Sequence, residues 1–321
     1  MRSGIKILTS YRTILNTPGA LAVKYTIFAL VETNSICVQM DSDNLQMLNV
    51  GYASLDGDWN WCGVGSPFTR IYYVVEGSAW IIMNGHNILL RPGHLYLIPA
   101  FTRHSYRCEG RFAHYYLHVY ENRRGQDSLF DRYDFPTEAA AESGDAELFR
   151  TMCNRHPGSA LPAFNPALYD NNGRLADFAA TFAALPPAKK MFLRGVILIL
   201  LSRFMAGATP KIAVADARLL PVMRQIDEHL DTNLDLDTLA STACMSKAYM
   251  IRLFRRCTGM TPLAYINRRR VEKAQLMLVT TGLSVKEIAY ILGFTDNSYF
   301  NRLFKKTTGR TPLDYRNSTD G

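Results

Sequence analysis

A fourteen-residue segment near the end of the chain occurs twice, at an offset of 50 residues. Arg252 to Tyr265 reads RLFRRCTGMTPLAY, and Arg302 to Tyr315 reads RLFKKTTGRTPLDY. Nine positions are identical and two more exchange Arg for Lys, whereas average residue usage gives about one match by chance. Two copies are too few for a solenoid. The repeat therefore predicts a tandem pair of similar units.

Each copy has the pattern of a helix, a tight turn and a second helix. In the later copy, Ser284 and Glu287 are spaced as a capping box, and an apolar stripe follows at helical spacing. Gly293 supplies the positive φ that ends the first helix, and Asp296 is a good cap for the next one. The earlier copy has a turn one residue shorter, with Ser246 as the cap. Both patterns predict helix-turn-helix units.

The second helix of each unit is predicted to have two unlike faces. Tyr249 and Tyr299 are expected to pack inward with neighbouring Met, Leu and Phe residues. Asn and Arg side chains pair with adenine and guanine, while Ala and Ile contact the thymine methyl group. The outward residues are the candidates for DNA contact: Lys247, Ala248, Ile251, Arg252, Arg255, Asn297, Ser298, Asn301, Arg302 and Lys305. The alternative is that they form the solvated faces of two ordinary helix pairs.

The positive charge of the chain is concentrated in the same region. Residues 241–316 hold fourteen Lys and Arg against four Asp and Glu, which gives +10, so the rest of the chain sums to −2 of the total +8. Such a basic segment is typical of a nucleic-acid module, although a solvated basic face is the alternative on charge alone. Between the units, Leu263 to Leu278 is predicted to form one helix that acts as a strut. Its Arg268-Arg269-Arg270 run is expected to contact phosphates or acidic neighbours rather than bases.

These residues resemble the AraC/XylS family of bacterial regulators. The resemblance covers Leu220 to Arg316 and is carried by LASTACMSKAYMIRLFRRCTGMTPLAYINRRRVEKAQLML and IAYILGFTDNSYFNRLFKKTTGRTPLDYR. It implies a seven-helix domain whose two recognition helices enter adjacent major grooves. Ile251 departs from the polar residue often found in its place. The base-reading candidates that the resemblance implies are Ala248, Ile251, Arg252, Asn297, Ser298, Asn301 and Arg302.

The region from Met47 to Tyr120 favours short β-strands. Asn84-Gly85, between two runs of strand-forming residues, is a strong hairpin signal. Several short strands with turns at this spacing predict a small β-barrel or sandwich. The segment RIYYVVEGSAWIIMNGHNILLRPGHLYLIPAFTRHSY resembles the cupin-type effector domain of AraC-like regulators, over roughly Leu45 to Tyr120. The expected strands are Ile71 to Val75, Trp80 to Met83, His86 to Leu90, Leu95 to Ile98 and Arg111 to Tyr120.

Many cupins bind a metal, and histidines are candidate ligands for it. The second cupin motif is largely present, including His104, but the stretch before Glu76 lacks the H-x-H pair of the first motif. A metal site needs three or four protein ligands. His114 and His118 share one strand face with each other by parity and are the remaining candidates. We expect no metal and no other cofactor.

The barrel is instead expected to enclose a small organic effector. Indoles stack on the apolar faces of sugars or rings, while Arg and His side chains fix polar groups. A sugar is the class that the resemblance favours. The alternative for each residue is an ordinary place in the barrel core or on a hairpin surface. The candidates are Trp59, Trp61, Arg70, Tyr72 and His104.

The expected fold class is α+β multidomain, with an N-terminal cupin-like β-barrel, helices after it, and a C-terminal all-α domain of two helix-turn-helix units. Met191 to Met205 is apolar almost all round, so it is expected to be buried against the barrel or a second subunit. By resemblance, this region makes a homodimer. The expected domains are an unassigned extension (1–44), the effector domain (45–135), a helical dimerisation region (136–205), a linker (206–217) and the DNA-binding domain (218–321).

The expected location is the cytoplasm. Six cysteines without CxxC spacing fit reduced thiols. The N-terminus does not read as a secretory signal, and the most apolar runs are shorter than the roughly 20 residues that span a bilayer. We therefore expect no membrane association.

The predicted function is that of a sequence-specific, double-stranded-DNA-binding transcription regulator, and not of an enzyme. By resemblance it is an activator, switched by an effector in the barrel. One alternative is a metal-dependent cupin enzyme with a DNA-binding tail, which stoichiometric metal and turnover would reveal. Another is an effector-independent DNA binder, whose DNA affinity would not respond to any ligand.

Overall fold

The chain divides into two units, Met1–Asp41 and Ser42–Gly321. In the first, strands β1 (Ile27–Ala29) and β2 (Val38–Met40) pair antiparallel. The rest of the first 43 residues, which the sequence left unassigned, lies outside the described part of the chain. The computed structural model describes residues 27–29, 38–40, 44–121, 129–169, 172–210, 216, 218–232 and 234–317.

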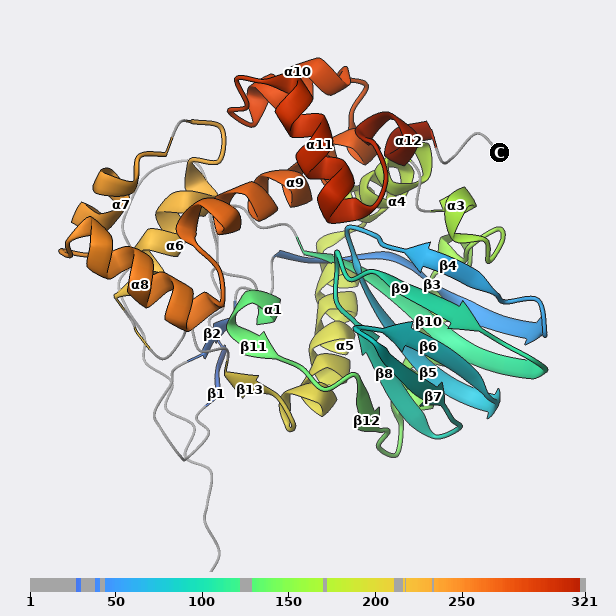
Figure 1. Cartoon of the computed structure of the whole chain (residues 1–321). Coiled ribbons are helices and arrows are strands. Elements are labelled where there is room, and N and C mark those ends of the chain that lie inside the picture. The colour runs from blue at the N-terminus through green and yellow to red at the C-terminus, as the bar shows by residue number, and fades with distance from the viewer. Residues whose placement is uncertain are drawn as a thin grey trace, which may run out of the picture. The chain divides into compact units, whose positions relative to one another are not determined.

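The second unit begins with two antiparallel sheets (Figure 1). The five-stranded sheet has the order β12-β8-β5-β10-β3, and the four-stranded sheet has the order β4-β9-β6-β7. The two separate sheets enclose one core, as expected of the predicted small β-barrel or sandwich, and the domain is called the barrel below. The strands are β3 (Leu45–Asp56), β4 (Trp61–Val64), β5 (Thr69–Gly77), β6 (Ala79–Met83), β7 (His86–Leu90), β8 (His94–Ile98), β9 (His104–Arg107), β10 (Arg111–Glu121) and β12 (Glu138–Ala140).

The predicted hairpin at Asn84-Gly85 is confirmed. Strands β6 and β7 pair with Met83 opposite His86, so the loop has two residues. Asn84 has φ 53° and Gly85 has φ 79°. Two central residues with positive φ are what a type I′ turn needs, and the twist of that turn matches the twist of the strands.

The five-stranded sheet is covered on both faces. Its inner face points into the barrel core, where Tyr72 and Tyr96 are buried. On the outer face, helix α2 (Asp145–Arg155) places Phe149 against Tyr73 and Tyr115, with ring centroids 6.2 Å and 5.8 Å away. A sheet covered on both faces loses the alternation of apolar and polar residues. Because β12 pairs with β8, this sheet continues to residue 140, beyond the expected boundary at 135. The domain boundaries stay a prediction.

Short helices follow the barrel, as expected. In addition, β11 (Tyr133–Asp134) pairs with β13 (Thr209–Pro210). Within the described residues, no helix is both long and apolar enough to cross a membrane. The helices are α1 (Leu129–Arg132), α2, the 3₁₀ turn η2 (Pro157–Ser159), α3 (Pro166–Tyr169), α4 (Asn172–Ala184) and α5 (Pro187–Met205).

Helix α5 is the apolar helix of the sequence analysis. One of its faces is buried, with Leu193, Leu200 and Phe204 among its inaccessible side chains. The opposite face is not, because Met191 remains 65% exposed and Ile199 41% exposed. The buried face fits the expected packing against the barrel, and burial of the other face against a second subunit stays a prediction.

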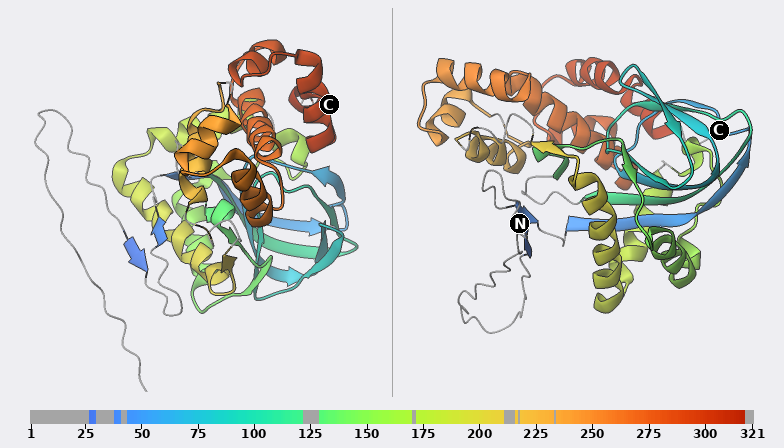
Figure 2. Two further views of the ribbon diagram at one scale, coloured as in Figure 1. Left: turned by 60° about the vertical axis from the view of Figure 1, so that its left-hand side comes forward. Right: turned by 90° about the horizontal axis from the view of Figure 1, so that it is seen from below.

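The described residues of the C-terminal part form seven helices, as expected, and the central one joins two small cores. The first half of this helix, α9, adds Tyr265 and Ile266 to the first core, and its second half adds Val271 and Leu278 to the second. Figure 2 shows the orange-to-red helices from two further directions. The helices are α6 (Leu219–Glu228), α7 (Leu236–Thr242), α8 (Lys247–Thr258), α9 (Pro262–Thr280), α10 (Val285–Ile291), α11 (Asn297–Thr308) and α12 (Pro312–Asn317).

Candidate functional site

Helices α7 and α8 form the first helix-turn-helix unit. The Asp235 side chain accepts a hydrogen bond from Thr238 N at 3.2 Å and so begins α7. Cys244, with φ 52°, turns the chain after α7. Ser246 then caps α8 by accepting from Tyr249 N at 3.4 Å. The predicted cap is confirmed, and the turn relies on a left-handed residue that is not glycine.

Helices α10 and α11 form the second unit, with the predicted caps. In the capping box, Glu287 N donates to the Ser284 hydroxyl at 3.2 Å, and Ser284 N donates to the Glu287 carboxylate at 2.7 Å. Gly293 has φ 71° in the turn, and Asp296 accepts from the backbone N of the second residue of α11 at 2.7 Å. Gly309, with φ 83°, ends α11. Each signal acts within one turn of helix, so the sequence alone revealed it.

The ten predicted DNA-contacting residues lie on α8 and α11. All are exposed except Ile251 and Asn301, which are half-buried. The Lys247 ammonium lies 2.8 Å from the Asp237 carboxylate, an exposed ion pair that holds this side chain beside α7. The Arg302 guanidinium lies 3.9 Å from Asp296, at the limit of an ion pair. The two helices therefore present the candidate side chains to solvent, where a duplex could reach them.

Tyr249 and Tyr299 do not pack inward as expected. Tyr249 is 37% exposed and its hydroxyl accepts from Arg218 at 3.2 Å, while Tyr299 is 42% exposed and its hydroxyl accepts from Asn267 at 3.0 Å. Both lie in the first turn of a recognition helix, at the edge of its buried face. A phenol at such an edge buries its ring in part and keeps its hydroxyl in contact with polar neighbours.

The arginine run on α9 binds acidic and backbone groups, one of the two roles expected for it. Arg269 is buried and pairs with Asp227 of α6 at 2.7 Å and with Glu272 at 2.6 Å. Arg270 is also buried and donates to the Leu230 and Thr232 carbonyls, at 3.0 Å and 2.6 Å.

Arg270 also reaches the second unit. It donates to the Gly293 carbonyl at 3.4 Å and lies over the Phe294 ring at 5.3 Å. One guanidinium therefore connects the segment after α6 to the turn of the second unit.

The interior of the barrel is lined by polar and aromatic side chains in cross-strand rows. His118 of β10 lies opposite Asn49 of β3 and Arg70 of β5. Tyr116 of β10 similarly lies opposite Tyr72 of β5. Residues directly opposite each other in antiparallel strands project from the same face. All five side chains are buried.

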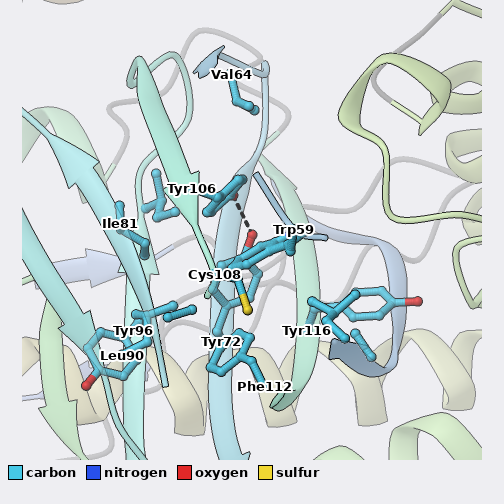
Figure 3. Packing of buried hydrophobic residues seen from close by; sticks show 14 of the residues in the cluster. Trp59, Val64, Tyr72, Ile81, Leu90, Tyr96, Tyr106, Cys108, Phe112 and Tyr116 are labelled. Atoms are coloured by element: carbon cyan, nitrogen blue, oxygen red, sulfur yellow. Dashed lines mark hydrogen bonds between the residues drawn. The ribbon is translucent and has the colours of Figure 1, made fainter. Parts of the chain in front are cut away.

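Four of the five predicted effector residues meet in this interior, as Figure 3 shows for Trp59 and Tyr72. The Trp59 ring stacks on Tyr106 with centroids 3.9 Å apart, and its centroid lies 6.1 Å from that of Tyr72. The Tyr72 and Tyr106 hydroxyls are 2.6 Å apart, and Tyr106 contacts His104 Nε2 at 2.7 Å. Arg70 donates to the Ser66 hydroxyl at 2.6 Å.

Trp61, the fifth candidate, packs against the same core cluster but is only partly buried there. It is half-buried on β4 and lines a cleft that the barrel shares with α9 and α12. The sequence analysis missed Tyr106, Tyr116 and Asn49 as interior residues. In β10, the even-numbered positions hold Phe112, His114, Tyr116 and His118. This alternation of ring-bearing residues could have predicted Tyr116 as an interior residue.

Burial keeps the interior histidines and Tyr72 neutral. It lowers the pKa of His104 and His114 to about 3, and it lowers the pKa of His118 well below its usual value. The Arg70 guanidinium lowers the pKa of His104 and His118 further. Burial likewise raises the pKa of Tyr72 well above its usual value.

Neutral His104 fixes the direction of the hydrogen bonds. Its Nδ1 donates to the Thr102 carbonyl at 2.8 Å, so its Nε2 accepts from the Tyr106 hydroxyl. Tyr106 then accepts from Tyr72. The Asn49 amide and the Nδ1 atoms of His114 and His118 have no hydrogen-bond partner among the described residues. In the same part of the chain, no group of three or more His, Cys, Asp or Glu is placed to hold a metal.

Two family models match the chain at these places. The model of a helix-turn-helix domain matches residues 239–318, and that of an AraC-like ligand-binding domain matches residues 65–125. The first match coincides with the tandem units, and the second, to an AraC-like domain, coincides with most of the barrel.

The C-terminal region is similar to known proteins. The transcriptional activator RhaS of Salmonella schwarzengrund is 33% identical over 108 residues, which are 34% of this chain and 37% of that relative. The chain thus matches little more than a third of the length of this curated relative. The DNA-binding domain of AdpA, solved in complex with a target DNA, is 36% identical over 32% of this chain and 91% of its own, with a TM-score of 0.30.

A longer but weaker likeness extends over the barrel. ToxT of Vibrio cholerae, solved with a bound unsaturated fatty acid, is 16% identical over 84% of this chain and 94% of its own, with a TM-score of 0.46.

Proposed function

We propose that the chain regulates transcription by binding a bipartite DNA sequence through α8 and α11. The observation that carries this proposal is the pair of exposed, basic recognition helices on one shared helix, α9, with a core at each end. Phosphate contacts from the Lys and Arg side chains supply affinity, and contacts to base edges supply specificity. The relatives named as transcriptional activators favour activation as the sign of regulation.

The ten candidate residues divide by their place along the two helices. Ala248, Asn297 and Ser298 begin the helices, and Ile251, Arg252, Asn301 and Arg302 follow one turn later, where base edges are within reach. Arg255 and Lys305 lie in the last turns, which suits phosphate contact. Lys247 is positioned by Asp237 and belongs with the phosphate contacts.

The test is selection of random-sequence DNA by the full chain at several salt concentrations. We expect enrichment of a motif with two half-sites about one helical turn apart, with an affinity that falls as salt rises. A folded chain that enriches no motif would contradict the proposal.

We further propose that a small effector, with a sugar as the favoured class, binds in the barrel and switches the regulator. Besides the Arg70 guanidinium, the interior presents neutral polar groups beside aromatic rings, which suits a ligand with several hydroxyls. The phenol of Tyr72 donates to Tyr106 and keeps lone pairs for a ligand hydroxyl. Trp59 would supply the stacking face.

Titration with a panel of monosaccharides, followed by tryptophan fluorescence and by DNA affinity, tests the switch. We expect one sugar to change both signals, and Tyr72→Phe to weaken its binding. DNA affinity that no sugar changes would contradict the sugar class.

The exposed face of α5 supports a homodimer as the acting form. Met191 and Ile199 place apolar surface in solvent on one side of this helix. Ile199→Asp should shift the chain toward monomer in sedimentation equilibrium. The matched control is Leu89→Asp, because Leu89 is also exposed but lies on hairpin strand β7. Equal association of both variants would exclude α5 as the interface.

A further inference from the structure

The two recognition helices are built alike from end to end. Helices α8 and α11 are each 12 residues long, and every residue of α8 has a counterpart 50 residues later in α11. Each helix begins one residue after a capping side chain, Ser246 or Asp296, and each ends at a glycine with positive φ, Gly259 or Gly309. Counterparts therefore lie at the same height along the two helices.

The two helices also turn the same face toward their cores. Met250 and its counterpart Phe300 are inaccessible to solvent, and so are Phe254 and its counterpart Phe304. The outward positions agree in burial as well: 248 and 298 are exposed, 251 and 301 are half-buried, and 252 and 302 are exposed. Each unit therefore presents the same three outward positions, and the units differ only in the side chains at these positions.

One of the three positions holds the same residue in both units. Arg252 and Arg302 lie in the second turn of their helices, and both are exposed. A guanidinium matches the O6 and N7 acceptors of guanine with two hydrogen bonds, which is the commonest specific contact between a side chain and a base. Arginine at the same place in both readers favours a guanine at the same place in both half-sites.

The other two positions differ in chemistry between the units. In α8, Ala248 and Ile251 are three residues apart, so they lie side by side and form a surface without hydrogen-bonding groups. Ile251 also packs in part against the first core, which limits its freedom to turn away. In α11 the same two places hold Ser298 and Asn301, which offer a hydroxyl and an amide.

The apolar and the polar surface select different bases. An apolar side chain against a polar base edge leaves that edge without hydrogen bonds, which costs free energy, whereas the methyl group of thymine suits such a side chain. The Asn301 amide can donate to N7 of adenine and accept from its N6 amino group. Against a thymine methyl group the same amide would lose its hydrogen bonds to water without replacement.

We propose that the two half-sites share a guanine, read by Arg252 and Arg302, and differ at a neighbouring base. That base is a thymine contacted by Ile251 in the first half-site and an adenine paired with Asn301 in the second. The DNA site is then an imperfect direct repeat, which the chain binds in one direction. This inference rests on the proposed DNA-binding function, and it adds the bases that the two helices distinguish.

The first test exchanges the two side chains in the full chain and repeats the selection of random-sequence DNA. Ile251→Asn should change the preferred base of the first half-site from thymine to adenine, and Asn301→Ile should make the reverse change in the second. The guanine of each half-site should stay. The control is Leu263→Asn, which places the same amide at an exposed apolar position of α9 and should leave both half-sites unchanged.

The second test uses the parent chain, so it holds even if an exchange disturbs folding. In the selected duplex, deoxyuridine in place of thymine removes only the methyl group, and 7-deazaadenine in place of adenine removes only the N7 acceptor. Fluorescence anisotropy should show the affinity falling about four-fold for deoxyuridine in the first half-site. It should fall about five-fold for 7-deazaadenine in the second half-site.

The bases opposite these two supply matched controls. Deoxyuridine opposite the adenine that pairs with Asn301, and 7-deazaadenine opposite the thymine contacted by Ile251, should leave the affinity unchanged.

The proposal is overturned if the two half-sites share no guanine, or if an exchange leaves its half-site unchanged and the matching analogue has no effect. Either result still includes a selected bipartite motif, so it leaves the proposed function standing. A folded chain that selects no motif contradicts the proposed function, and this inference falls with it.

Discussion

Three consecutive arginines on α9 have different surroundings and, we expect, different energetic roles. Arg268 is partly exposed and lies 3.4 Å from Glu272. Arg269 and Arg270 are buried, the first against carboxylates and the second against backbone carbonyls. A buried guanidinium that satisfies several carbonyls is costly to remove, because those acceptors lose their donors in a place that water does not reach.

Arg270→Met should therefore destabilise the DNA-binding region by roughly 2–4 kcal/mol, the range for breaking a buried network. The Leu230, Thr232 and Gly293 carbonyls would each lose a donor. Urea unfolding of the variant measures the change. Arg268→Met on the same helix should cost less than about 1 kcal/mol, because its ion pair is long and partly exposed and Glu272 keeps its shorter pair with Arg269. Similar losses in both variants would contradict a special role for Arg270.

The buried histidines predict that stability is lost on mild acidification. The pKa values of His104 and His114 are lowered to about 3 in the folded chain, against about 6.5 when unfolded. The unfolded chain therefore binds more protons between these values. The stabilisation is complete above pH 6.5 and falls as the pH drops toward 3. Each group contributes up to about 1.4 kcal/mol per pH unit in that window.

Urea titrations from pH 7.5 to 5 measure this dependence. His114→Asn should reduce the slope of unfolding free energy against pH below 6.5. His86→Asn, at an exposed position of the β6–β7 hairpin, should leave the slope as in the parent chain. A parent chain whose stability is flat over this range would refute charging of the interior histidines on unfolding.

At the scale of elements, we expect residues early in each recognition helix to contact bases and residues late in the helix to contact phosphates. Arg302 is exposed in the second turn of α11, and Lys306 is exposed in its last turn. Arg302→Ala should relax base preference at one position of the selected motif, at a cost of about 1–3 kcal/mol. Lys306→Ala should weaken binding to all sequences alike and lower the salt slope by about one.

Selection and salt titration of both variants measure these effects. A loss of affinity that is uniform over sequences for Arg302→Ala would assign that residue to the phosphates instead.

Local signals made the helix-turn-helix units predictable, and long-range pairing limited the prediction of the barrel. The caps at Ser284 and Asp296 act over two or three residues, so the sequence displays them directly. The cross-strand neighbours of Tyr72 depend on the register of β5 and β10, which short-range patterns do not encode. For the same reason the sequence does not separate Trp59, which is buried in the core, from Trp61, which is partly buried against it and also lines a cleft.

At the scale of the molecule, α9 sets the distance between the two DNA readers. It contributes to a core at each end, and Arg270 connects the segment after α6 to the turn before α11. Its 19 residues make it about 28 Å long, at about 1.5 Å per residue. The grooves that the readers would occupy repeat at roughly 34 Å on a straight duplex.

Because α9 is one continuous helix with a core at each end, we expect the DNA to adjust to the spacing of the two units. The duplex would then curve toward the protein so that both grooves are reached, at a cost of order 1–6 kcal/mol for 40–90°. Circularly permuted fragments should migrate as bent DNA with the bend centred between the half-sites, and uniform migration would exclude it. The central base pairs, which no side chain needs to touch, would then be selected for their flexibility. Promoters would be distinguished partly by how easily they bend.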